Sequence, residues 1–189
     1  MPVVLLVFFF IPVAMIVAIV WLLRRGKAAD DESQAPFVRL LNGRVGSDRT
    51  VEGTYQGSIV TGRVVGAEAT DARNPWRFEL TMPAGSGPND WSLKNDAGNW
   101  SVQSEHAPIA ELLKGEGATT IAATVSPSAV TYRAGDGTLT TGWDAADAGW
   151  PDAGLAQRRL EALVSLAAIA RRVNATAPGG TEQSASPPA

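Results

Sequence analysis

The chain has 189 residues, of which 45% are apolar, with a formal net charge of −3 and no cysteine. The absence of cysteine excludes disulfides, thiolate zinc sites, iron–sulfur clusters and a cysteine nucleophile. Three of the 16 basic residues lie at 24–27, which leaves 13 against all 19 acidic residues in the rest of the chain. A mildly acidic body without a basic stripe argues against nucleic-acid binding, because phosphates are contacted by clustered Lys and Arg.

The first predicted element is an uncharged, apolar run over residues 2–23. As a helix it would be about 33 Å long, enough to cross a hydrocarbon core of about 30 Å. A cleaved signal peptide would begin with basic residues and end in a small-residue cleavage site. This run has neither, and it ends directly in Arg24 and Arg25. We therefore predict a retained transmembrane helix over 1–23, with the lipid bilayer as the partner of residues 2–23.

The orientation of this helix is predicted from the residues that flank it. Trp21 lies where interfacial aromatic residues belong, and Arg24, Arg25 and Lys27 follow it. Flanking Lys and Arg remain on the cytoplasmic side of a membrane. We expect a single-pass protein of the bacterial inner (plasma) membrane with its soluble domain in the cytoplasm. A periplasmic or extracellular domain is the alternative.

Residues 24–36 are small and charged, which is typical of a linker. An α+β soluble domain is predicted to follow over 37–174, opening with either a helical turn or a strand at Phe37. Alternating apolar residues predict a strand over 75–83 and hairpins over 50–65 and 91–102.

Residues 107–117 predict a short helix. Residues 119–126, 129–134 and 138–143 predict a three-stranded meander, since apolar and polar positions alternate. Residues 151–175 predict a long helix with an apolar stripe at 3–4 spacing that includes Leu155, Leu160, Leu163, Leu166, Ala170 and Val173. The fold class is therefore a mostly antiparallel sheet covered by a long C-terminal helix. Residues 175–189 are too polar and too rich in Pro and Gly for order, and predict a disordered tail.

Few residues suggest catalysis. His106 is the single histidine, and Ser104 and Glu105 precede it directly. Adjacent residues do not face one another as a proton relay requires, so His106 is interpreted as a loop residue. Asp144 and Asp147 lack the ligand spacing of a calcium loop, and no phosphate-binding glycine motif occurs. We predict no catalytic residue, no metal site and no cofactor.

Tryptophan offers one further hint, because an indole ring provides a large contact area and one hydrogen-bond donor. Trp143 and Trp150 precede the long helix and are the candidates for an exposed patch that binds a small ligand, a lipid or a glycan. The alternative is that these residues pack in the core, which is the more common fate of such residues.

The layout resembles uncharacterised bacterial single-pass inner-membrane proteins with a β-rich soluble domain. The segments that carry the resemblance are RRGK, GTYQGSIVTGRVV, AVTYRAGDGTL and RLEALVSLAAIARRVNA. It covers residues 24–175 and implies no activity and no site residues. The sequence therefore predicts a non-enzymatic interaction or scaffold module at the inner membrane, with an unidentified protein partner. The alternative is the ligand-binding domain that would use Trp143 and Trp150.

Overall fold

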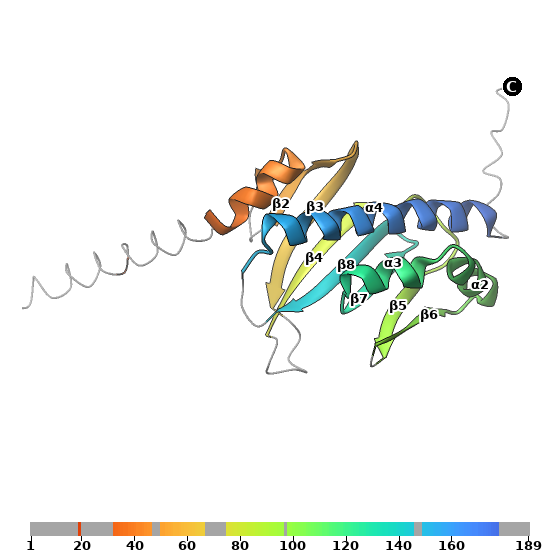
Figure 1. Ribbon diagram of the computed structural model, residues 1–189. Helices are drawn as coiled ribbons and strands as arrows, with labels where there is room; N and C mark the ends of the chain where they lie inside the picture. The colour runs from red at the N-terminus through yellow and green to blue at the C-terminus, as the bar shows by residue number, and fades with distance from the viewer. Residues whose placement is uncertain are drawn as a thin grey trace, which may run out of the picture.

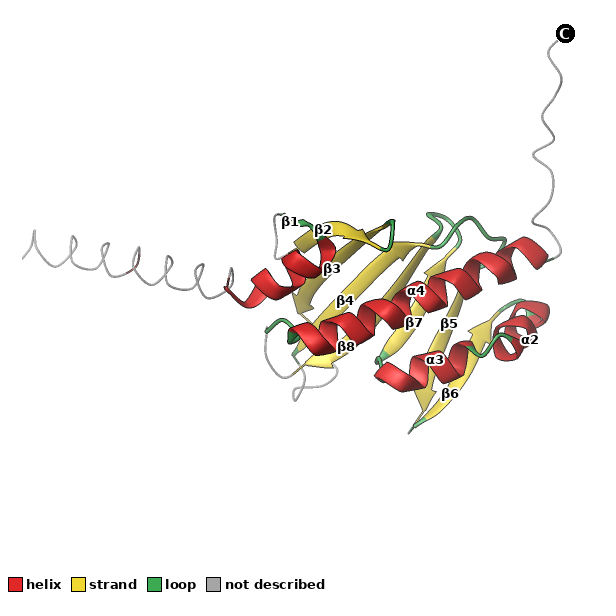
Figure 2. Ribbon diagram, turned by 45° about the horizontal axis from the view of Figure 1, so that its top comes forward, coloured by secondary structure: helices red, strands yellow, loops and turns green. Residues whose placement is uncertain are grey.

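The computed structural model describes residues 19, 32–46, 50–66, 75–96, 98–145 and 149–177. The described residues form two layers, a single antiparallel sheet and a layer of helices on one of its faces (Figures 1 and 2). The prediction of an α+β fold with an antiparallel sheet and a long C-terminal helix is confirmed.

The sheet has eight strands, in the order β1-β2-β3-β4-β8-β7-β5-β6. Every neighbouring pair is antiparallel. The strands are β1 (Arg44–Val45), β2 (Thr50–Tyr55), β3 (Ser58–Gly66), β4 (Trp76–Pro83), β5 (Trp91–Asp96), β6 (Asn99–Ser104), β7 (Ala129–Arg133) and β8 (Thr138–Ala145). Both predicted hairpins are present as β2–β3 and β5–β6.

Among the residues described from 32 onward, four helical segments cover one face of the sheet (Figure 2). Residues 32–41 are helical and precede β1. Helices α2 (Ala107–Gly115) and α3 (Ala118–Val125) connect β6 to β7, and α4 (Ala153–Thr176) follows β8. Successive side chains of β4 point to opposite faces of the sheet, so Phe78, Leu80 and Met82 are buried beneath this layer.

Helix α4 is the long cover that the sequence predicts. It begins at Asp152, whose carboxylate accepts a hydrogen bond of 2.9 Å from the backbone N–H of Leu155, as a capping residue does. Near its other end, Arg172 forms an ion pair of 2.6 Å with Glu116, in the link between α2 and α3. Arg171 donates a hydrogen bond of 2.9 Å to the backbone carbonyl of Pro83. The last turns of α4 are thus joined to the link between α2 and α3 and to the end of β4.

The opposite face of the sheet is polar. Arg63 on β3 pairs with Glu79 on β4 through Nε and Oε2 at 2.8 Å. Thr81 and Thr140 share a hydrogen bond of 3.1 Å between their hydroxyl groups, across β4 and β8. Cross-strand pairs of this kind stabilise a sheet face that is exposed to water.

Two predictions about local structure are wrong. Residues 119–126 do not form the first strand of a meander, because Ala118–Val125 is the helix α3. Its alanines suit a helix. Ala118 and Ala122 are buried while Thr120 between them is exposed, which follows the helical period and not the strand period. The linker predicted over 24–36 is also too long, since residues 32–36 are helical and Gln34 is buried.

The remaining boundaries differ in detail. Helix α4 extends to Thr176, so the predicted tail over 175–189 begins too early; residues 178–189 lie outside the described residues. Residues 1–23, with the exception of Ile19, also lie outside them. Within the part of the chain that the structure describes, no helix combines the length and apolarity that a membrane crossing needs.

An aromatic cluster of Phe37, Phe78, Trp143 and Trp150 connects helix 32–41 to the sheet. The ring centroids of Phe37 and Phe78 lie 5.6 Å apart, and those of Phe37 and Trp150 lie 5.1 Å apart. Gly62 on β3 allows this approach, because a Cβ atom there would lie 2.5 Å from Cε1 of Phe37. Helix 32–41 is therefore part of the domain core.

We expect Gly62→Ala to destabilise the domain by about 1–3 kcal/mol, because the added methyl group would overlap the Phe37 ring, which is held on two sides. Urea unfolding followed by circular dichroism measures the change. Gly66→Ala is the matched control on the same strand, since a Cβ atom there meets nothing within 4 Å. Equal stability of the two variants would show that Phe37 does not require a glycine beneath it.

Candidate functional site

The structure places the two candidate tryptophans in the aromatic cluster. Trp143 lies on β8 with 4% of its surface exposed, and Trp150 is half-buried against Phe37 and Phe78. The exposed pair that the sequence suggested is therefore absent, and core packing accounts for Trp143. The predicted membrane flank of Trp21, Arg24, Arg25 and Lys27 lies outside the described residues.

His106 is the residue before α2, and its imidazole makes no capping hydrogen bond. Ser104 Oγ accepts a hydrogen bond of 3.2 Å from the backbone N–H of His106, not from its ring. No Ser–His relay is formed by these residues. Among the described residues, no group of three or more His, Asp or Glu lies close enough to hold a metal ion.

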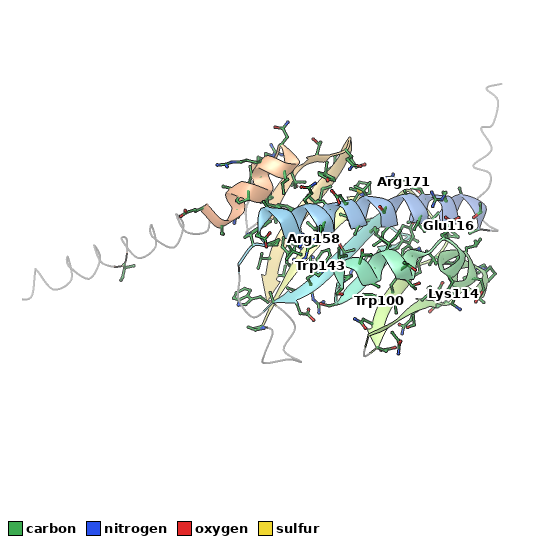
Figure 3. All side chains as sticks on the ribbon, in the orientation of Figure 1. Trp100, Lys114, Glu116, Trp143, Arg158 and Arg171 are labelled. Carbon is green, nitrogen blue, oxygen red and sulfur yellow. The ribbon has the colours of Figure 1, made fainter. Side chains whose placement is uncertain are left out.

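The unusual side chain of the domain is Arg159 on α4. It is half-buried beneath the helix, and its Cζ lies 4.5 Å from the centroid of the Trp143 ring and 5.6 Å from that of Phe78. A guanidinium over an aromatic face is attracted by the electrons of the ring. Figure 3 shows Trp143 beneath α4 and labels Arg158, the exposed neighbour of Arg159.

Arg159 has no hydrogen-bond acceptor or ion-pair partner among the described residues, and its Nε is buried without a partner. Burial lowers the pKa of the Arg159 guanidinium to about 10, an effect that the charge of Asp152 partly offsets. Because this pKa is above 7, the side chain stays charged at neutral pH. A buried donor without a partner, such as this Nε, is costly, so such groups are normally paired.

Arg159 lines a cavity of about 610 Å³, which we call the Arg159 cavity. Its walls come from the β5–β6 hairpin, the segment after α3, β8 and α4: Asn95, Gly98, Val125, Ser126, Pro127, Ser128, Trp143, Asp144 and Arg159. The lining thus joins one guanidinium and one indole ring to two serine hydroxyls and an amide.

Hydrogen bonds fix the wall of this cavity to β8. The indole N–H of Trp143 donates to the backbone carbonyl of Val125 at 2.9 Å. The backbone N–H of Ser128 donates to the carbonyl of Gly142 at 2.7 Å, and Ser128 Oγ accepts from the N–H of Asp144 at 2.8 Å. The segment between α3 and β7 is therefore held in place by contacts on both sides of Trp143.

The charge of the cavity is set by Arg159. Asp144 is the single acidic residue among the described residues of its lining, and its Oδ1 already accepts a hydrogen bond of 2.9 Å from Nε of Arg77. Asp144 is thus engaged by Arg77, and the guanidinium of Arg159 has no ion-pair partner among the described lining residues. A guanidinium suits carboxylate and phosphate groups because it can donate two parallel hydrogen bonds to them.

The sequence-based reasoning missed Arg159. A signal for it exists, because Ala156, Leu160 and Leu163 all belong to the buried stripe of α4 and Arg159 lies three to four positions from two of them. A charged residue inside an apolar helix stripe predicts a buried charge. Which groups face it depends on segments distant in sequence, including β8 and the loop at 126–128.

We expect Arg159→Met to be at least as stable as the parent protein, because an unpaired buried donor costs about 1–3 kcal/mol. The lost cation–π contact, worth about 0.5–2 kcal/mol, offsets part of this gain. Urea unfolding measures the result, with the exposed Arg158→Met as control, for which we expect a change below about 0.5 kcal/mol. A loss above about 2 kcal/mol in Arg159→Met alone would show that Arg159 serves packing.

Comparison with known proteins gives no relative from which a function could be transferred. The chain matches no protein family, no curated protein and no solved structure. The resemblance to single-pass inner-membrane proteins stays a prediction, and the function is argued from the geometry of the Arg159 cavity.

Proposed function

We propose that the domain is a non-catalytic binding module that holds a carboxylate or phosphate group of a small ligand in the Arg159 cavity. The observation that supports this is a half-buried guanidinium without an acceptor among the described residues, beside a cavity of about 610 Å³. An anion bound there would supply the missing hydrogen bonds and compensate the charge. This proposal keeps Trp143 as a lining residue of the cavity and replaces Trp150 by Arg159.

The lining of the cavity supports binding without catalysis. A general acid or base needs a titratable group within reach of the ligand. Asp144 is the single carboxylate among the described residues of the lining and is engaged by Arg77. Ser126, Ser128 and Asn95 offer hydrogen bonds to polar atoms of a ligand next to its anionic group. Trp143 lies against the guanidinium of Arg159 and orients it at the cavity.

The location of the module is part of the proposal. Residues 2–23 anchor the chain in the inner membrane, and Trp21, Arg24, Arg25 and Lys27 keep the domain on the cytoplasmic side. Helix 32–41 supports a close connection between anchor and domain, since Phe37 and Leu41 are fully buried. The domain would then sample anionic ligands next to the membrane surface.

We expect sodium phosphate and sodium acetate to stabilise the full chain in detergent micelles, compared with sodium chloride at equal ionic strength. A single arginine contact suggests a dissociation constant on the order of 1 mM, so 10 mM of the anion would add about 1.4 kcal/mol. Thermal unfolding followed by circular dichroism measures the shift in Tm.

Arg159→Met should abolish this stabilisation, whereas Arg158→Met should retain it, because both remove one positive charge from α4 and only one of them lies in the cavity. Trp143→Phe should weaken it by a smaller factor. Equal responses of the two arginine variants would contradict the proposal, as would a parent protein that neither anion stabilises.

A further inference from the structure

The strand β6 lies at one margin of the sheet (Figure 2). It pairs with β5 through residues 99–104, and among the described strands no other lies beside it. The outer side of β6 therefore presents a row of backbone N–H and C=O groups, which is the template that a further strand can join.

The two margins of the sheet differ in how they are protected. At the β1 margin the strand has two residues, and Arg44 forms an ion pair of 3.5 Å with Glu52. The sequence of β6, NWSVQS, has six residues without a charged residue or a proline. Charges, prolines and short length are the usual means by which edge strands avoid pairing. The β6 margin has none of them.

The side chains of β6 alternate between the two faces. Val102 is paired with the buried Leu93, so Trp100, Val102 and Ser104 face the helical layer. Asn99, Ser101 and Gln103 lie on the polar face, where Ser92 is opposite Gln103. An added strand that places apolar groups on the helical side and polar groups on the other would match this pattern.

We propose that a second copy of this chain supplies that strand, so that two β6 strands pair antiparallel about a two-fold axis at Ser101. This register places Ser101 opposite Ser101, Asn99 opposite Gln103 and Trp100 opposite Val102 of the other copy. Each residue meets one on its own face, and no like charges meet because β6 has none. Pairs of an aromatic with a β-branched residue are among the favourable cross-strand pairs.

The symmetry of this dimer is compatible with a shared membrane. A two-fold axis perpendicular to the sheet leaves the helical layers of both copies on the same face. Helix 32–41 belongs to that layer, so it lies on the same side of the joined sheet in both copies. A pairing of about five residues from each copy buries less surface than the roughly 1,200 Å² of a stable interface. We therefore expect a weak dimer that depends on a high local concentration.

Cysteine cross-linking tests the pairing directly, since the chain contains no cysteine. Directly opposed residues of an antiparallel pair have Cα atoms about 4.5–5.5 Å apart, which a disulfide can span. We expect Ser101→Cys, in the full chain reconstituted in liposomes, to form a disulfide-linked dimer on mild oxidation. Ser92→Cys on the same face of β5 should remain monomeric, because it lies one strand inside the margin.

A second variant separates pairing from chance collision. Ser101→Lys would place two ammonium groups opposite each other at the axis, which disfavours pairing. Energy transfer between donor- and acceptor-labelled copies should then fall to the level measured when the two kinds of copy are in separate liposomes. Circular dichroism confirms that both Ser101 variants fold. The proposal is overturned if Ser101→Cys gives no dimer, if Ser92→Cys cross-links equally, or if Ser101→Lys leaves energy transfer unchanged.

Discussion

The apolar face of the eight-stranded sheet must be covered, and the rest of the structure follows from how α4 covers it. The helix lies across the strands (Figure 1), Asp152 caps its start, and the ion pair of Arg172 with Glu116 joins its last turns to the link between α2 and α3. Its buried stripe, which includes Leu160 and Leu163, packs against the sheet. Arg159 is the charged residue on the margin of that stripe, and it is thereby held against Trp143.

The position of Arg159 combines two opposing contributions to the free energy of folding. Removal of a guanidinium from water is unfavourable, which its lowered pKa also reflects. The contact with the Trp143 face is favourable but supplies no hydrogen-bond acceptor. The remaining donors are held in place before any ligand arrives, so an anion would bind without first ordering the side chain.

The elements with a strong local pattern could be predicted from the sequence. Apolar and polar residues alternate along β4, and apolar residues recur at 3–4 spacing along α4. Each pattern therefore identifies a single type of secondary structure. Helix α3 could not be assigned in this way, because eight residues rich in Ala and Thr fit either period and packing beside α4 decides. The Arg159 cavity was beyond such reasoning as well, since the pairing of β4 with β8 joins residues 55 to 69 positions apart.

The burial of helix 32–41 limits how far the domain can move from the proposed anchor. Since Phe37 and Leu41 belong to the core, at most residues 24–31 separate the proposed membrane helix from the domain. Eight residues, even fully extended, span at most about 28 Å. In the proposed arrangement the domain occupies a thin layer along the lipid surface, and diffusion within the plane of the bilayer, not through the bulk of the cell, governs which molecules it meets.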